Sequence, residues 1–178
     1  MTTLEEIEEE KMIRGPESQT LYPYPEHSKL VPSVILDTTM GNMKLEFYFT
    51  HAPKTCKNFI EHCRSSYYEP VIFHRIQKNM WVQTGDPTST SRGGESIWGK
   101  PFEDEVTPYL KHKRAGLVSM CNSGQPDTNG SQFFITLGAC PWLDGKHSIF
   151  ARVTKGMSIL KCMNILPVDK NDRSLHPS

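Results

Sequence analysis

The chain has 178 residues, equal numbers of acidic and basic side chains, and 37% hydrophobic residues. This length predicts one domain with a short appendage, large enough to bury roughly two thirds of its unfolded surface without disulfides or metal. A formal charge of zero argues against nonspecific nucleic-acid binding, which needs a surplus of Lys and Arg. No apolar run approaches the ~18 residues of a membrane span.

The composition also bears on compartment and on organisation. The five cysteines are odd in number and widely spaced, and the N-terminus has no secretory signal, which favours a cytoplasmic or nuclear protein with reduced thiols. Residues 1–33 carry seven acidic and three basic residues, a net of −4, so residues 34–178 net +4. We therefore predict an acidic, proline-rich extension over 1–33 and a folded domain over 34–178. Two interpretations of the extension stay open, a solvated tail or a segment that docks on a partner or on the domain.

The domain begins with a β-rich stretch. Residues 34–36 start a strand, and residues 43–49 alternate apolar and polar side chains, which is typical of a strand with one buried face. Gly41-Asn42 lies between the two runs and predicts a two-residue hairpin turn. Pro53 then suits the first turn of a helix. The helix carries one apolar face, formed by Cys56, Phe59, Ile60 and Cys63.

A second hairpin is predicted from residues 71–76 and 80–83, with residues 77–79 as its turn and Asn79 in the left-handed conformation. That turn pairs Arg75 with Trp81 and Phe73 with Gln83. An arginine then shares one face of the sheet with two aromatic rings and an amide. Spacing alone leaves two interpretations open, a structural cation–π contact or a functional site.

The remaining elements are short. Glycines and prolines break residues 85–108, and β-type runs follow at 117–120, 132–137 and 149–153. The long loop 121–131 is full of turn residues, and a loop of this length usually serves binding. Apolar residues over 157–165 predict a closing helix. Many short strands with two helices favour a closed β-barrel plugged by helices.

Most motifs of cofactor or covalent chemistry are absent. There is no phosphate-binding P-loop, no G-x-G-x-x-G after a strand, no G-x-S-x-G, no H-E-x-x-H and no C-x-x-C. An enzyme built from this sequence is expected to use neither a cofactor nor a metal nor a covalent intermediate.

Several stretches together resemble the cyclophilin family of peptidyl-prolyl cis/trans isomerases, in matching order across about residues 34–168. They are Phe73-His-Arg-Ile76, Gln83-Thr-Gly-Asp-Pro87, Phe102-Glu-Asp-Glu105, Thr128-Asn-Gly-Ser-Gln-Phe-Phe134 and Trp142-Leu-Asp-Gly-Lys-His147. Gln83–Pro87, Gly93-Gly94 and Ser96-Ile-Trp-Gly99 are most similar to the compact single-domain members associated with splicing complexes. The resemblance implies a mainly β fold, a closed eight-stranded antiparallel barrel capped by two helices. The family's last strand, an alternating apolar run, is missing after Asp172-Arg173.

The resemblance also implies the activity and its residues. The family isomerises X–Pro bonds of proteins without covalent chemistry, by stabilising the twisted amide, and so assists folding or assembly. Arg75, Gln83 and Phe134 are expected to be catalytic, with Gln83 orienting Arg75 or the substrate backbone. The substrate-binding residues are expected to be Met80, Trp81, Cys121, Asn122, Gln132, Trp142, Leu143 and His147.

The implied partners are proline-containing peptides and proteins, a cyclosporin-type ligand and a protein of a splicing complex, with no nucleic acid, no membrane and a monomeric chain. Trp142 accompanies cyclosporin sensitivity in the family. Met80 stands where the family usually has Phe, and Trp81 stands where it has Met, Val or Ile. We therefore expect cyclosporin to bind with weakened affinity.

Three function classes follow. The first is an isomerase acting on proline-containing proteins. The second is a binding module of the same fold, which docks a proline peptide in a splicing-type complex with little turnover and to which Met80 and Trp81 lend weight. The third is a β-barrel carrier of small apolar ligands, which leaves the arginine face unexplained.

Overall fold

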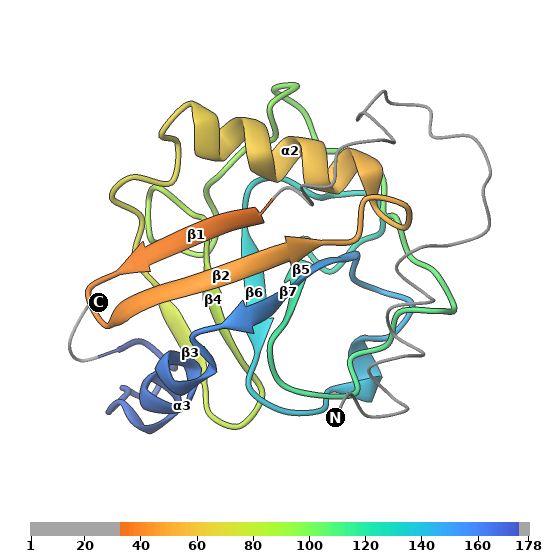
Figure 1. The fold of residues 1–178 in the computed structure, drawn as a ribbon. Coiled ribbons are helices and arrows are strands. Elements are labelled where there is room, and N and C mark those ends of the chain that lie inside the picture. The colour runs from red at the N-terminus through yellow and green to blue at the C-terminus, as the bar shows by residue number, and fades with distance from the viewer. Residues whose placement is uncertain (1–32, 175–178) are drawn as a thin grey trace.

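The computed structural model describes residues 33–174, which form one antiparallel sheet and two α-helices (Figure 1). The predictions for residues 1–32 lie outside these residues. The strands are ordered β1-β2-β7-β5-β6-β4-β3 across the sheet. The elements are β1 (Ser33–Thr38), β2 (Gly41–Phe47), α2 (Pro53–Arg64), β3 (Arg75–Gln77), β4 (Trp81–Thr84), β5 (Leu117–Met120), β6 (Phe133–Thr136), the short 3₁₀ helix η1 (Pro141–Leu143), β7 (Ile149–Lys155) and α3 (Met157–Ile165).

The first hairpin is confirmed, but its turn lies earlier than predicted. Thr38 pairs with Gly41, so residues 39–40 form the turn and Gly41-Asn42 begins β2. The side chain of Thr38 explains the shift. Its hydroxyl donates to the carbonyl of Gly41 at 2.7 Å and accepts the N–H of Met40 at 3.2 Å, which closes the chain locally.

The alternation in β2 is confirmed, since Met43, Leu45 and Phe47 are all buried. Tyr48 departs from the pattern: it too is buried, because it packs with Leu117 and Ile149 in a small cluster separate from the main core. Tyr48 lies directly after the end of β2, where residues of β5 (Leu117) and β7 (Ile149) cover it. The period-two pattern of a single strand does not reveal such cover.

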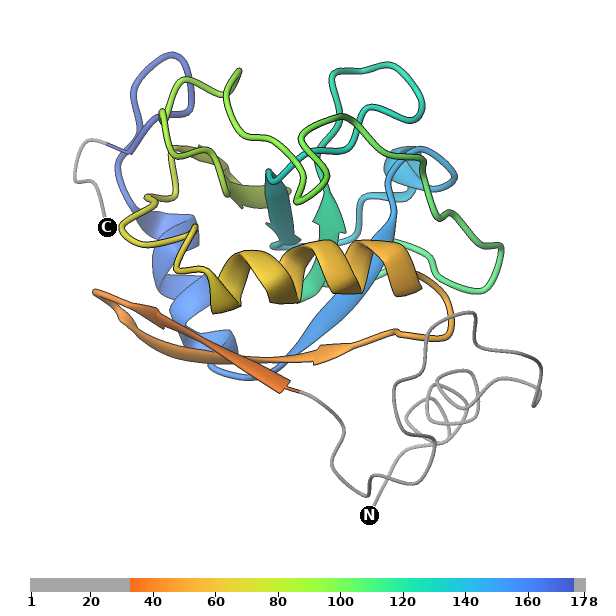
Figure 2. The same cartoon turned by 90° about the horizontal axis from the view of Figure 1, so that it is seen from above.

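Both predicted helices contribute to one core. Phe59 of α2 contacts Phe47, Phe133 and Phe150 with ring centroids 5.1–5.7 Å apart. Leu160 of α3 belongs to the same buried cluster. Figure 2 shows the sheet curving around α2, with α3 to one side. The curvature and the two helices together keep the inner face of the sheet away from water.

The closed eight-stranded barrel is not what the structure shows. Within residues 33–174 the sheet has seven strands, and its edge strands β1 and β3 do not pair with each other. Residues after α3 form a turn and one isolated bridge, Val168 to Ser174, in place of an alternating strand. The sheet is therefore a half-barrel, because no described segment joins its two edges. α3 packs beside β2, β3 and β4 instead.

α3 itself begins at a tight approach. Gly156 precedes it with φ of 91°, and a Cβ at this position would lie 2.5 Å from the carbonyl oxygen of Asn42, so glycine is required there. Leu160 and Met163 are buried as expected, whereas Ile165 at the last turn is 77% exposed. Between residues 33 and 174, neither helix is long and apolar enough to cross a membrane.

Candidate functional site

Four strands align a row of side chains across one face of the sheet. Arg75 of β3 lies opposite Gln83 of β4, Gln83 lies opposite Phe134 of β6, and Phe134 lies opposite Ser119 of β5. Residues that are directly opposite in antiparallel strands share a face, with Cβ atoms about 4.5–5.5 Å apart. The flanking residues Phe133 and Ile135 of β6 point into the core. The row therefore occupies the face away from that core.

The predicted register of this hairpin is wrong by two residues, although the predicted face is right. Gln77 pairs with Trp81, and Arg75 pairs with Gln83 rather than with Trp81. Met80 belongs to the turn, where its N–H donates to the carbonyl of Gln77 at 3.0 Å. Asn79 takes the left-handed conformation as expected, with φ of 64°. Because side chains alternate with a period of two, a slip of two leaves Arg75, Trp81 and Gln83 on their predicted face. Phe73, which was predicted on the same face, instead lies before the start of β3 and packs in the main core.

Arg75 remains reachable from solvent. Its side chain is 38% exposed, and its Nη2 donates to a carboxylate oxygen of Asp172 at 3.2 Å. The side-chain amide of Gln83 donates elsewhere, to Oε1 of Gln132 at 2.8 Å, and Gln132 in turn donates to the carbonyl of Gly93. Sequence reasoning named Gln83 and Gln132 but missed Asp172, which lies 97 residues from Arg75 and carries no local signal.

Phe134 is buried and contacts three rings that belong to different segments of the chain. Trp81 tilts against it at 5.8 Å between ring centroids, and His147 meets it edge-on at 5.5 Å. His112 stacks on it at 5.9 Å with 22° between the planes. Trp81 and His147 were predicted as neighbours of this pocket, whereas His112 was not. The ring of Phe134 is thus fixed in position as an apolar surface beside the polar end of the row.

His112 is held by two side-chain hydrogen bonds. Its Nδ1 lies 2.9 Å from a carboxylate oxygen of Asp144, and its Nε2 lies 2.9 Å from the hydroxyl of Ser119. Burial lowers the pKa of His112, and the bond to Asp144 only partly opposes this. A neutral imidazole that donates from Nδ1 and accepts from Ser119 satisfies both contacts. This Ser–His–Asp chain is buried at Ser119, so it acts as a support for Phe134 and not as a nucleophile.

Turns form the rim beside the row. Trp142 and Leu143 lie in η1, and Trp142 is 51% exposed. The thiol of Cys140, just before η1, lies 3.5 Å from the carbonyl of Met80, which joins the two turns. The turn that contains Met80 is thereby linked to the segment just before Trp142 and Leu143, 60 residues away in sequence.

The long loop 121–131 supplies the other side of the rim. The Asn122 amide donates to the carbonyl of Lys146 at 2.9 Å, next to His147. Nδ1 of His147 lies 3.0 Å from the carbonyl of Met120, and burial lowers the pKa of this histidine. The N–H of Cys121 donates to the carbonyl of Gln132. Burial also raises the pKa of the Cys121 thiol, so it is protonated and unreactive at neutral pH.

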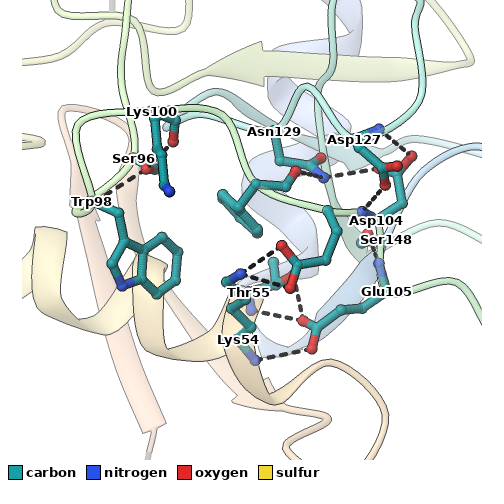
Figure 3. A network of polar contacts seen from close by, with 12 residues as sticks. Lys54, Thr55, Ser96, Trp98, Lys100, Asp104, Glu105, Asp127, Asn129 and Ser148 are labelled. Atoms are coloured by element: carbon teal, nitrogen blue, oxygen red, sulfur yellow. Dashed lines mark hydrogen bonds and ion pairs between the residues drawn. The ribbon is translucent and has the colours of Figure 1, made fainter.

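A polar network holds the loops in place (Figure 3). The carboxylate of Glu105 accepts the N–H groups of Lys54 and Thr55 at the start of α2, at 3.1 and 2.7 Å. Ala52 has no side chain to cap this helix, so a loop residue 50 positions away caps it. The N–H of Glu105 itself donates to the hydroxyl of Ser148, which follows His147.

The same network reaches the long loop 121–131. Asp104 and Asp127 exchange backbone N–H to carboxylate bonds at 2.8 and 3.0 Å, and the Asn129 amide donates to Asp104 at 2.8 Å. Segments without regular structure are thereby ordered by side-chain contacts, which fits loops that carry a site.

The chemistry available on this face is non-covalent. It combines an accessible guanidinium, two amide side chains and a fixed phenyl ring, which suit an amide carbonyl and an apolar ring next to it. Within residues 33–174, no cluster of three or more His, Cys, Asp or Glu side chains is arranged to hold a metal ion. The guanidinium, the amides and the phenyl ring together suit non-covalent binding of a peptide.

Comparisons with known proteins agree with this. Residues 33–178 match the profile of the family described as cyclophilin type peptidyl-prolyl cis-trans isomerase/CLD. The chain is 56% identical over 144 residues to peptidyl-prolyl cis-trans isomerase-like 1 of Neurospora crassa, which covers 81% of this chain and 88% of that protein. It is 54% identical over 145 residues to a peptidyl-prolyl cis-trans isomerase of Arabidopsis thaliana, with coverages of 82% and 88%.

A solved structure is similar as well. A cyclophilin type peptidyl-prolyl cis-trans isomerase of Cryptosporidium parvum, crystallised in the presence of the dipeptide Ala-Pro, superposes with a TM-score of 0.80 at 41% identity. The match covers 82% of this chain and 93% of that one.

Proposed function

Because the chain belongs to the cyclophilin-type peptidyl-prolyl cis-trans isomerases, we propose that the row of Arg75, Gln83 and Phe134 is the site at which it rotates X–Pro bonds. The observation that carries this proposal is the strand register. It places the accessible guanidinium of Arg75 and the fixed phenyl ring of Phe134 on the same face of the sheet, two strands apart. A similar protein was crystallised in the presence of the dipeptide Ala-Pro, which supports a proline-containing peptide as the ligand.

The reaction needs stabilisation of one geometry. Rotation about a peptide bond meets a barrier of ~18–20 kcal/mol because the planar amide is stabilised by resonance. In the twisted form that resonance is lost and the amide nitrogen becomes pyramidal. Arg75 donates to the proline carbonyl and favours this form, while Phe134 holds the pyrrolidine ring. Catalysis then follows from binding the twisted amide more tightly than either planar isomer.

The neighbours of the row have binding roles in this proposal. Four residues align the peptide backbone. Two are Gln83 and Gln132, whose side chains are bonded to each other, and two are the loop residues Cys121 and Asn122. Five residues complete the apolar wall around the ring. One is Trp81 of β4, and the others lie on the rim: Met80, Trp142, Leu143 and His147.

The test is exchange NMR on a short Ala–Pro peptide with wild type and Arg75→Ala. We expect kcat/KM to fall by at least ~100-fold, equivalent to about 2.7 kcal/mol, with the fold intact. Arg64→Ala is the matched control, because Arg64 is exposed and pairs with its helix neighbour Glu61, away from the row. Undiminished catalysis by Arg75→Ala would sink the assignment. A wild-type protein that bound the peptide without accelerating exchange would be a binding module.

Two finer partners belong to the same proposal. A cyclosporin-type ligand is supported by Trp142, which is exposed at the rim, and calorimetry measures its affinity. A protein of a splicing complex is supported by the stretches Gln83–Pro87 and Ser96–Gly99, and co-purification with purified splicing complexes tests it.

We place the protein in the cytoplasm or nucleus, supported by five cysteines that are all free, and localisation of the tagged chain tests this.

A further inference from the structure

The segment after α3 forms a turn that is rigid by its own hydrogen bonds. One carboxylate oxygen of Asp169 accepts the N–H groups of Asn171 and Arg173, at 2.7 and 2.9 Å. The N–H of Asp169 donates to the carbonyl of Arg173, and the N–H of Asp172 donates back to the carbonyl of Asp169. Asp172 has φ of 61°, the left-handed region that Asp and Asn tolerate best among residues with a side chain.

This turn docks on the edge of β3 at the candidate site. The N–H of Ile76 donates to the carbonyl of Asp172 at 2.7 Å. The preceding residue, Arg75, donates from Nη2 to the carboxylate of the same Asp172 at 3.2 Å. Arg173 adds a third anchor, from Nη1 to the carbonyl of Ser89 at 3.1 Å. The backbone and the side chain of Asp172 are thus both held by consecutive residues of β3, which sets the position of its carboxylate relative to the Arg75 guanidinium.

Within the row, no other described side chain holds the Arg75 guanidinium. Gln83, directly opposite Arg75, gives its side-chain amide to Gln132. A guanidinium has five N–H donors in a planar fork. One bond from Nη2 to Asp172 leaves the other donors available, and the Arg75 side chain is 38% exposed, so a peptide carbonyl can reach it.

We propose that Asp172 is a positioning residue for Arg75, holding the guanidinium in the orientation from which it donates to the twisted amide. This inference rests on the function proposed above and adds to it a residue from the far end of the domain. A long side chain that is oriented before substrate arrives does not lose its rotamer freedom in the transition state. The contribution of Asp172 is therefore expected in kcat more than in KM.

The pair itself contributes little to stability. Both side chains are more than a third exposed, and ion pairs in such settings are weak because water screens them. A variant that removes only the charge is therefore expected to fold. Asp172→Asn is that variant, since asparagine has the same shape, tolerates the left-handed conformation and leaves the carbonyl bond to Ile76 in place.

The experiment compares wild type, Asp172→Asn and Arg173→Ala by exchange NMR on a short Ala–Pro peptide. We expect kcat of Asp172→Asn to fall roughly 5- to 10-fold with KM changed by less than about twofold. Arg173→Ala is the matched control, because it loosens the same turn from Ser89 without touching Arg75, and its kcat is expected to stay within about twofold of wild type.

Two further readouts separate positioning from a structural role. The Nε–Hε signal of Arg75 is expected to shift and broaden in Asp172→Asn but not in Arg173→Ala. In an Arg75→Ala background, Asp172→Asn is expected to change the residual rate by less than about twofold, since the two residues act as a unit.

An Asp172→Asn protein with unchanged kcat overturns the inference, and so does one with raised kcat, which would make the carboxylate a competitor of the substrate carbonyl. Equal losses from Asp172→Asn and Arg173→Ala would assign the effect to the turn as a whole. If Arg75→Ala itself keeps full activity, the proposed function fails first, and the two failures are told apart by that single variant.

Discussion

The strand-borne row and the turn-borne rim of this site are built by different means. Arg75, Gln83 and Phe134 are placed by consecutive backbone ladders between β3, β4 and β6. Trp142 and Asn122 lie on turns, and these turns depend on single side-chain bonds that span long stretches of sequence. The Asp144 carboxylate next to η1 holds His112, 32 residues away, and Asn122 holds a carbonyl 24 residues away.

This difference separates two roles. Residues on paired strands move only if several backbone hydrogen bonds break, so the row keeps the precise geometry that its proposed catalytic role requires. Residues on turns adjust at the cost of one or two side-chain contacts. We therefore expect substitutions in the row to change the rate, whether or not they also change stability. Substitutions in the loop network are expected to change stability and to leave the rate nearly unchanged.

The largest expected effect comes from the two faces of β6. Phe134→Ala removes a ring that contacts Trp81, His112 and His147, so we expect a loss of about 3–5 kcal/mol of stability. It also removes the apolar support for the proline ring, and kcat/KM is expected to fall at least ~10-fold. The control, Ile135→Val, faces the core and is expected to cost about 0.5–1.5 kcal/mol with kcat/KM within about twofold of wild type.

Denaturant unfolding and exchange NMR on the same samples measure both quantities. A Phe134→Ala protein that loses stability but no activity would mean that Phe134 is only structural, and the separation of roles would collapse.

A smaller effect is expected in the loop network. Glu105→Ala leaves the first N–H groups of α2 without their carboxylate, and loss of a helix cap costs roughly 1–2 kcal/mol. The control is Glu103→Ala. Glu103 pairs with Lys54 at the surface and is 57% exposed, so its removal is expected to lower the melting temperature far less. Because β3, β4 and β6 are untouched, kcat/KM is expected to change by less than about threefold in both variants.

Thermal unfolding followed at equal ionic strength checks this order. Equal losses in the two variants would show that capping of α2 is not what Glu105 contributes, and a collapse of activity in Glu105→Ala would show that the row depends on the loops after all.

The smallest effect concerns pH. Burial lowers the pKa of His112 below its ordinary value of 6.5, and His62 and His74 share this direction and cause. The unfolded chain then binds protons near 6.5 that the folded protein does not, so stability rises with pH through this region and is lost as pH falls from 6.5 toward the lower folded pKa. Each such histidine contributes at most ~1.4 kcal/mol per pH unit.

Chemical denaturation between pH 7.5 and 5.5 measures how the free energy of unfolding changes with pH, in a window above the range where carboxylates titrate. NMR titration of the His112 ring shows how much of this change belongs to His112. A His112 pKa at or above 6.5, or stability that rises as pH falls through this window, would contradict the proposed neutral support beneath Phe134.

The hairpin of Arg75 shows how far local pattern reaches. Alternation predicted that Phe73, Arg75, Trp81 and Gln83 share a face, and the structure confirms this for Arg75, Trp81 and Gln83. Phe73 packs in the main core instead, and Phe134 joins the face through the pairing of β4 with β6. The register was mispredicted because Met80 is apolar and reads as part of a strand, whereas the folded chain uses it in the turn. Side-chain period is a property of one strand, but register also depends on the partner strands β4 and β6.

The prediction of a closed barrel was wrong for a related reason. The family resemblance supplied an eight-stranded closed barrel, and the described residues form seven strands with β1 and β3 as edges. The apolar pattern of each strand is the same in an open and a closed sheet. Only the folded structure shows that α3 and the turn at Asp169–Arg173 lie against β3, one of these edges.

The sequence by itself determined most of the elements, the buried face of β2 and the family, and it named most side chains of the candidate site. Strand and helix periods and short motifs are local properties of the chain, which is why they can be read in this way. The tertiary structure decided which distant groups support these elements and side chains. Asp172 beneath Arg75, His112 beneath Phe134 and Glu105 at the start of α2 are each brought to their partners by the fold across 97, 22 and 50 positions. Contacts at such separations depend on chain topology and packing, which no local period encodes.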